Sequence, residues 1–344
     1  MKPSRFYGTI TMPPIGRLKD GRLLFLRNNT TPLPEKEGAD GVWEDVFTNR
    51  DVLHVAISDD DGRTWKGFRE LYLNPNRNDT AYAESNQDLS LDMSVHQTQF
   101  VELKDGNILV SLGQHVLHRK LLVFYPDWLL ETSREEDFSN GLTNWSTFLY
   151  QNGVVGHCAY NRSEGSELII NPADTTRQIL RIRKPMNENL ETPHQGAVWN
   201  FPAQQKGHLE TRVFVPSDSG GGPLSLMDRW FNAGDTAAFK YAMFHLDLKT
   251  LAPDRWHDLR FEWDLSGRSD YCSVVNAGGE TIARLLLNRA SLNGISYVHF
   301  ISDSQEPDDK GFYIEEISAR ADQCFPGKRL CRHICRFLWL PAQF

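Results

Sequence analysis

The sequence has little that would suit a nucleic-acid-binding or membrane protein. Its 37 lysines and arginines face 45 aspartates and glutamates, and the formal net charge is −8. This charge argues against nucleic acid as a partner, because phosphate backbones bind basic surfaces. No apolar run approaches the roughly 20 residues that a membrane helix needs, and residues 1–7 lack the apolar core of a signal peptide. We therefore expect no nucleic-acid partner and no membrane span, and the localisation stays unknown.

Cysteines are few, and three of the five lie near the C-terminus, at Cys324, Cys331 and Cys335. Together with His333 they could be drawn as a metal site, but their spacing matches no usual zinc pattern. The same stretch is rich in lysine and arginine and contains no acidic residue. We interpret residues 323–344 as an atypical basic tail, either a terminal extension or the product of a shifted reading frame. We predict no metal and no cofactor.

Aromatic residues make up 11% of the chain and include nine tryptophans, which is more than a plain core needs. Aromatic rings offer flat apolar surfaces, and proteins use them to hold the apolar faces of sugars. The alternative is that a β-sandwich core simply uses many aromatic side chains. Composition therefore favours a carbohydrate as one candidate partner.

Residues 58–65 are the most informative stretch, because Ser58, Asp60, Gly62, Thr64 and Trp65 fill every position of the pattern S-x-D-x-G-x-T-W. The serine and aspartate can bond amides within a turn, the glycine can take a positive φ, and the tryptophan ring can bury against the loop. Short stretches rich in β-branched and aromatic residues flank this pattern, at residues 52–57 and 68–73. The stretch predicts a tight hairpin between two strands.

This pattern resembles the Asp-box of sialidases and related β-propeller glycosidases, where it joins the third and fourth strands of a blade. The resemblance implies a blade over residues 11–73, and it implies intact relatives that are secreted or periplasmic. It marks the fold more strongly than the activity, because the Asp-box lies on the rim of a propeller, away from the central pocket.

A second hairpin signal supports a repeat. The stretch Leu-Lys-Asp-Gly at residues 18–21 recurs at residues 103–106, and Asp-Gly between apolar runs is a strong two-residue turn signal. The second blade would begin near residue 94 and use three strands, at residues 97–103, 107–113 and 120–125. Propellers usually close with at least four blades, and two blades leave an exposed apolar face. We therefore predict an incomplete β-propeller of about two blades over residues 1–131, in the C-terminal part of a longer protein. The alternative is a ring completed by several chains.

The remainder of the chain predicts a β-sandwich. Residues 126–136 read as a linker or short helix, and residues 137–145 resemble the first strand of concanavalin-A-like and carbohydrate-binding jelly rolls. Strands with alternating apolar and polar residues follow, at residues 178–182, 196–201, 207–215, 224–230, 241–246, 258–264, 271–276, 281–287, 297–301 and 311–317. About ten short strands in fewer than 200 residues indicate a sandwich or jelly roll, here over residues 132–322. The predicted fold class is all-β, an incomplete propeller followed by a C-terminal sandwich.

The propeller resemblance places chemistry where inner strands point toward the central axis. The residues at these places could serve glycoside chemistry, with a carboxylate as acid or nucleophile, a histidine as acid/base and an arginine to bind an anionic sugar. The catalytic candidates are Glu44, Asp45, Arg50, His96 and Arg119. Candidates for substrate binding lie nearby in the sequence, at Asn29, Trp43, Gln97, His115 and His118. Sialidases use an arginine cluster and a Tyr–Glu pair, and neither can be read from the spacing in this chain. The alternative is a set of surface salt bridges and polar loops.

The predicted sandwich has its own candidates at a strand end, where Asp228, Arg229, Trp230 and Asn232 follow the glycine run at residues 220–222. Sugar sites need a ring-stacking aromatic residue beside hydrogen-bonding amides and carboxylates. The alternative is a buried Asp–Arg pair that supports a corner of the sheet.

Two functions from different classes follow. The first is a sialidase-like glycoside hydrolase that acts on the terminal sugars of glycans. The second is a non-catalytic carbohydrate-binding or structural module. The hydrolase and the carbohydrate-binding module would each have a glycan or oligosaccharide as partner, whereas a purely structural module would not.

Overall fold

The protein is described from a computed structural model that covers residues 6, 12–30, 52–73, 95, 97–113, 119–147, 149–154, 157–161, 165–186, 194–236, 238–267 and 269–321. Within these ranges it is all-β, as the sequence predicts. The named strands form five antiparallel sheets, and the only helices in this part are short 3₁₀ helices. No helix in the described ranges is long and apolar enough to span a membrane.

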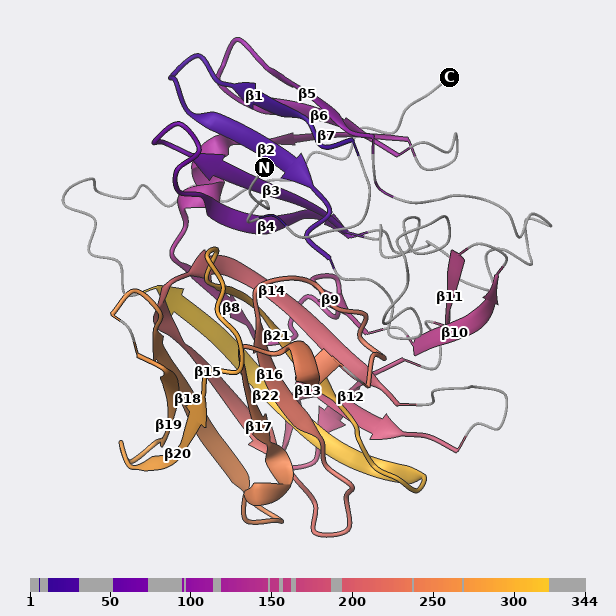
Figure 1. The fold of residues 1–344 in the computed structure, drawn as a ribbon. Coiled ribbons are helices and arrows are strands. Elements are labelled where there is room, and N and C mark those ends of the chain that lie inside the picture. Colours follow the sequence, from indigo (N-terminus) through magenta and orange to yellow (C-terminus); the bar gives the residue numbers. More distant parts are fainter. Residues whose placement is uncertain are drawn as a thin grey trace.

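The first sheet is a four-stranded meander in the order β1-β2-β3-β4. Its strands are β1 (Ile15–Arg17), β2 (Leu23–Arg27), β3 (Val52–Ser58) and β4 (Lys66–Leu73). β3 pairs with β2 on one side and β4 on the other. It is buried along its whole length because apolar clusters cover both faces of the sheet, with Val55 in one cluster and Val52 and Ala56 in clusters on the opposite face. The two predicted strands around the Asp-box are therefore confirmed (Figure 1).

The Asp-box forms the turn between β3 and β4. Ser58 Oγ accepts a hydrogen bond from the Gly62 amide at 2.9 Å, and Asp60 accepts from the Thr64 amide at 2.8 Å and from its hydroxyl at 2.6 Å. These bonds from Thr64 hold the pKa of Asp60 down at about 2. Gly62 has φ +81°, and its carbonyl accepts from Trp65 Nε1 at 3.1 Å. The motif therefore makes the hairpin that its residue types predict.

A three-stranded sheet lies next to the first one, in the order β5 (Gln99–Glu102), β6 (Ile108–Leu112) and β7 (Lys120–Phe124). The two sheets share an apolar cluster that includes Leu24, Val55 and Val110. The two repeated Asp-Gly turns also meet, because the Lys19 amide donates to Glu102 Oε2 at 2.7 Å. Figure 1 shows both sheets on one side of the sandwich.

The outer face of this three-stranded sheet leaves apolar side chains in solvent. Val101, Leu121 and Val123 are all exposed. An incomplete propeller over residues 1–131 stays a prediction.

The rest of the described chain is a sandwich of two sheets around one large apolar core. The larger sheet runs in the order β12 (Glu167–Asn171), β13 (Asp174–Lys184), β22 (Asp308–Ala321), β15 (Lys206–Phe214), β18 (Trp256–Asp264), β19 (Tyr271–Asn276) and β20 (Thr281–Leu286), with β8 (Ser133–Glu136) also on β22. The smaller runs in the order β17 (Phe244–Asp247), β16 (Pro223–Met227), β21 (Ile295–Ile301), β14 (Gly196–Gln204) and β9 (Trp145–Ser146). A separate pair joins β10 (Leu149–Val154) to β11 (His157–Asn161).

The sandwich forms because its strands alternate buried and exposed residues. In β15, Leu209 and Val213 enter the core while Glu210 faces solvent. Facing residues from the other sheet, such as Trp199 and Phe300, fill the core from the opposite side. The predicted β-sandwich is confirmed.

The start of the sandwich differs from the prediction. Residues 126–130 form the 3₁₀ helix η3 (Pro126–Leu130), and the stretch taken as a linker ends in strand β8. Of the first strand predicted at residues 137–145, only Trp145 lies in a strand, as the start of β9; the residues before it form turns, in which Phe138 has φ +62° and Gly141 has φ +70°. Glu136 Oε1 accepts a hydrogen bond from the Phe138 amide at 3.0 Å. This carboxylate and the turn-forming residues after it outweigh the strand pattern.

Candidate functional site

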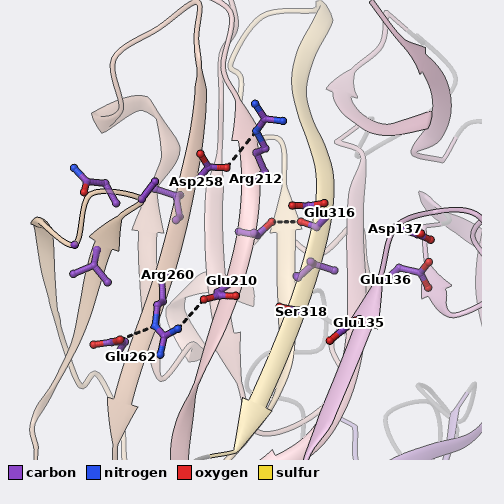
Figure 2. Close-up of a pocket in the computed structure, with 17 residues that line it drawn as sticks. Glu135, Glu136, Asp137, Glu210, Arg212, Asp258, Arg260, Glu262, Glu316 and Ser318 are labelled. Atoms are coloured by element: carbon purple, nitrogen blue, oxygen red, sulfur yellow. Dashed lines mark hydrogen bonds and ion pairs between the residues drawn. The ribbon is translucent and has the colours of Figure 1, made fainter. Parts of the chain in front are cut away.

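The outer face of the larger sheet carries an open pocket of about 910 Å³. It lies over β8, β15, β18, β19 and β22, and polar side chains line most of it (Figure 2). Strand alternation places these side chains there, because the residues between them point into the core. The polar lining residues include Glu135, Glu136, Asp137, Glu210, Arg212, Asp258, Arg260, Glu262, Asn276, Glu316 and Ser318.

Ion pairs within one strand and between neighbouring strands hold the two arginines of the pocket. Arg260 donates to Glu210 at 2.7 Å and to Glu262 at 2.6 Å (Figure 2). Burial by itself would lower the pKa of Arg260, but these two carboxylates outweigh it and raise that pKa. Arg212 Nε lies 3.2 Å from Asp258 Oδ1. Both guanidinium groups therefore have fixed positions on the sheet.

One buried carboxylate anchors this charged surface from the side. Glu315 is only 2% exposed, and it accepts from Arg212 Nη1 at 2.5 Å and from Asn171 Nδ2 at 3.0 Å. Arg177 Nη1 lies 3.1 Å from the same carboxylate. Glu315 can point this way because the pairing of β15 with β22 shifts register between Arg212 and Val213.

An aromatic strip, formed by Tyr313, Phe214 and Trp256, crosses the same face beside the pocket. The three residues are cross-strand partners on β22, β15 and β18. The ring centroid of Phe214 lies 5.4 Å from that of Trp256 and 5.9 Å from that of Tyr313. The Arg212 guanidinium lies over Trp256, 5.2 Å from the ring centroid. All three rings are partly exposed.

The strip was not found from the sequence, although a signal exists. Phe214 lies within a predicted strand at a position that alternation assigns to the solvent face, and Tyr313 does so in another. Large aromatic residues on the polar face of adjacent strands are the signal that could have found it. The sequence does not show which strands are neighbours, so the three rings could not be brought together.

Chemically, the surface combines apolar rings with hydrogen-bonding groups. Seven carboxyl groups and two guanidinium groups line the pocket, which therefore has a net negative charge. Such a surface can accept many hydrogen bonds from hydroxyl groups and offers rings for stacking. No group of His, Cys, Asp or Glu in the described part of the chain has the arrangement of a metal site.

The predicted sandwich candidates are placed elsewhere, against the four-stranded sheet. Trp230 has no exposed surface, and its Nε1 donates to Ser146 Oγ at 2.9 Å. Asp228 is 2% exposed, and its carboxylate accepts two hydrogen bonds from each of two guanidinium groups, those of Arg229 and Arg289, at 2.5–3.1 Å. Burial opposes ionisation of Asp228, but these guanidinium groups hold its pKa well below the usual range.

This burial favours the structural alternative for the four residues. A ring without exposed surface offers no face to a sugar, and the Asn232 side chain is likewise buried, with Oδ1 accepting from the Gly234 amide at 3.0 Å. Arg229 is used in the buried pair with Asp228. The pair supports the end of β16, as the alternative interpretation holds.

The candidates from the N-terminal region are described only in part. Asn29 is buried, donates from Nδ2 to the Asp228 carbonyl at 2.9 Å, and accepts from the Trp230 amide at 2.9 Å. Gln97 and Arg119 are both exposed. Seven others lie outside the described residues, namely Trp43, Glu44, Asp45, Arg50, His96, His115 and His118. The structure thus brings Asn29 to the sandwich candidates, which the sequence had placed in a separate site.

Comparisons with known proteins give only distant structural matches. No protein-family model and no curated protein matches the sequence. Among solved structures, a sialidase aligns with 92% of this chain at 12% identity and a TM-score of 0.34, and this chain covers 28% of its length. The Trypanosoma rangeli sialidase in complex with sialic acid aligns with 92% of this chain at 11% identity and TM-score 0.27, with 51% of its own length covered.

A second group of solved structures aligns with about half of the chain. A variant of LamA from Z. galactanivorans, in complex with laminaritriose and laminaritetraose, aligns with 54% of this chain and 97% of its own at 16% identity and TM-score 0.32. A glycoside hydrolase family 16 endo-glucanase from Bacteroides ovatus aligns with 55% of this chain at 9% identity and TM-score 0.30. The chain thus has distant structural similarity to sialidases and to β-sandwich glycoside hydrolases.

Proposed function

We propose that the chain binds a glycan in the pocket on the outer face of its larger sheet. The observation that carries this proposal is the aromatic strip of Tyr313, Phe214 and Trp256 beside a polar pocket of about 910 Å³. Sugar rings stack on aromatic side chains while their hydroxyl groups bond to polar neighbours, and sites of this size hold small ligands. Of the two functions predicted from the sequence, this is the carbohydrate-binding one.

Four of the seven carboxyl groups of the pocket are held in ways that suit binding better than hydrolysis. A glycosidase needs a carboxylic acid free to give its proton to the leaving oxygen. In the described part of the pocket, Glu210 and Glu262 are paired with Arg260, and Asp258 is paired with Arg212. Glu136 in turn accepts hydrogen bonds from the Phe138 amide and from Asn144. Carboxylates held in this way are hydrogen-bond acceptors rather than proton donors.

The charge of the pocket limits the class of glycan that it can bind. Seven carboxyl groups against two guanidinium groups repel an anionic sugar. We therefore propose a neutral oligosaccharide, and not a sialylated one, for this pocket.

We also propose that the chain divides into three parts, an incomplete propeller, a β-sandwich and a basic tail. Their limits are residues 1–131, 132–322 and 323–344.

The test is affinity for neutral and sialylated oligosaccharides, measured by isothermal titration calorimetry on the whole chain. Trp256→Ala should weaken binding of a neutral glucan oligosaccharide at least tenfold, or about 1.4 kcal/mol. Tyr271→Ala is the matched control, because Tyr271 is an exposed aromatic residue of the neighbouring strand β19 that belongs neither to the aromatic strip nor to the lining of the pocket. Unchanged affinity in Trp256→Ala, or preference for a sialylated glycan, would refute the proposal.

A second candidate function is a sialidase-like hydrolase in the N-terminal region, where the Asp-box and the four-stranded meander favour a propeller blade. This candidate requires release of a terminal sugar from an aryl glycoside. Its predicted groups are the catalytic candidates of the sequence, so turnover should fall in His96→Ala and in Arg119→Ala. Trp256→Ala should leave that turnover unchanged.

A further inference from the structure

Tyr297 of the sandwich lies between two side chains of the four-stranded sheet. Its hydroxyl donates to Glu70 Oε1 at 2.7 Å, and it lies 2.5 Å from His54 Nε2. Tyr297 belongs to β21, whereas His54 and Glu70 belong to β3 and β4. Tyr297 and His54 have no exposed surface, and Glu70 is partly buried. The three side chains therefore tie the two parts of the chain together.

The direction of every hydrogen bond in this group is fixed by one backbone amide. The Asn29 amide donates to His54 Nδ1 at 2.9 Å, so Nδ1 must carry a lone pair and the ring proton lies on Nε2. Nε2–H then donates to the Tyr297 oxygen. The single hydroxyl proton of Tyr297 is left for Glu70. We call this chain from Asn29 through His54 and Tyr297 to Glu70 the relay.

A side-chain amide reinforces the same contact. Asn200 of β14 accepts from the Glu70 amide at 3.0 Å and donates to the Phe68 carbonyl at 3.1 Å. It thereby satisfies two backbone groups at the outer edge of β4. Apolar residues from both parts, including Val52 and Trp230, pack beside it.

Charged groups surround the relay, and burial perturbs its titratable members. Burial raises the pKa of Glu70 to about 7, against the lowering effects of the Tyr297 hydrogen bond and of Arg134 and Arg69. Burial also lowers the pKa of His54 to about 3, and Arg27 adds to this lowering. Burial raises the pKa of Tyr297 far above its usual range, so it stays protonated.

Several of these neighbours are themselves held in place. Arg134 of β8 donates to the Asn200 carbonyl at 2.6 Å, and the carboxylates that favour its charge include Glu70, Glu136 and Glu131. Arg69 lies 3.0 Å from Glu131 Oε2. Arg27 has a buried guanidinium 5.1 Å from the ring centroid of Phe6. Arginine charges thus face the relay from β2, β4 and β8.

We propose that the relay makes the contact between the four-stranded sheet and the sandwich depend on pH, with protonation of Glu70 tightening it. The protonated carboxyl keeps Oε1 as the acceptor for Tyr297 and removes a buried negative charge. Ionisation leaves that charge in the contact, with only the neighbouring arginines to offset it.

Whether the contact tightens or loosens with pH follows from the directions in which folding shifts the pKa values of Glu70 and His54. Glu70 has a raised pKa, so its stabilising contribution is complete below the unfolded value of 4.5 and is lost as pH rises through about 7. His54 has a lowered pKa, so its contribution is complete above 6.5 and is lost as pH falls toward about 3. The two effects cancel between about 4.5 and 6.5. The contact should therefore loosen as pH rises from about 6.5 to about 7.5, and again as pH falls below about 4.5.

Hydrogen exchange on the whole chain tests this, read on peptides that cover residues 66–73 and corrected for the intrinsic effect of pH. In the wild type, protection should fall about twofold between pH 6.5 and 8.5, because His54 offsets part of the Glu70 effect. In Glu70→Gln it should not fall over that range, and it should exceed the wild type at pH 8.5 by up to about two orders of magnitude in the opening equilibrium. Glu102→Gln, at a carboxylate of the neighbouring sheet, is the control and should follow the wild type.

A second variant keeps the test decisive if Glu70→Gln does not fold. Tyr297→Phe removes the hydrogen bond that lowers the pKa of Glu70, so the loss of protection should move to higher pH. A wild-type pH profile in Glu70→Gln, or an unmoved transition in Tyr297→Phe, would overturn the proposal.

Discussion

The buried pairing of Asp228 with Arg229 and Arg289 gives a sharp prediction for stability. Replacing Asp228 with Asn keeps the shape of the side chain but removes its charge and turns an NH₂ group toward guanidinium donors. Asp228 has a side chain only 1% exposed, and it serves both forks of each arginine. Removing one partner of a buried ion pair costs about 3–5 kcal/mol.

The expected loss lies at the lower end of that range, because the arginines are not fully buried. The Arg229 and Arg289 side chains are 12% and 23% exposed, so water can solvate part of each group once the carboxylate is gone. We expect Asp228→Asn to lower the free energy of unfolding by about 3 kcal/mol. The stabilising contribution of Asp228 should hold above pH 3.8 and be lost as pH falls below it, because its pKa is lowered by folding.

Urea unfolding followed by tryptophan fluorescence measures this loss, as a shifted midpoint at constant slope. Asp218→Asn is the matched control, because Asp218 is 57% exposed and pairs with the exposed Lys310, and it should leave the unfolding midpoint nearly unchanged. A loss below about 1 kcal/mol in Asp228→Asn would refute the reasoning. Glycan affinity under folding conditions should be unchanged, since the pair lies away from the pocket.

Two glycines give further predictions. Gly62→Ala should destabilise the fold by about 1–2 kcal/mol in thermal unfolding, because the residue has φ +81°, a backbone conformation that alanine disfavours. Steric overlap adds nothing, since the new methyl group would lie 3.6 Å from the Trp65 ring. A loss below about 0.5 kcal/mol would contradict this. Gly196→Ala should cost about 3 kcal/mol or more and reduce the yield of folded protein, because a Cβ would lie 1.8 Å from the Ala233 carbonyl oxygen. Gly278→Ala, which meets only the Asn276 side chain at 3.3 Å, is the control for both.

Local patterns predicted much of the fold. Alternation along residues 207–215 and 271–276 placed strands where β15 and β19 lie, and the Asp-box placed the β3–β4 turn. These features depend on neighbouring residues, so a single sequence contains them. The strand prediction for residues 137–145 was wrong because strand-forming residues there alternate with strong turn formers.

The site was less predictable, because it depends on which distant residues meet. The relay joins His54 and Glu70 to a tyrosine more than 220 residues away. The aromatic strip likewise needs the neighbour order β22-β15-β18. Residue type does not reveal burial, so the sequence left Trp230 as either a sugar-stacking ring or part of a buried support. Spacing along the chain says nothing about such contacts.

The two hydrogen bonds from Asn200 to β4 have a consequence for how the parts are aligned. The Asn200 side-chain amide accepts from the Glu70 N–H and donates to the Phe68 C=O. Along one edge of a strand, backbone N–H and C=O groups point outward only at every second residue. A slip of the sheet by one residue would present a different edge, and a slip by two would pull Glu70 away from Tyr297. The sandwich thus selects a single register for its neighbour, through one side chain that carries no charge.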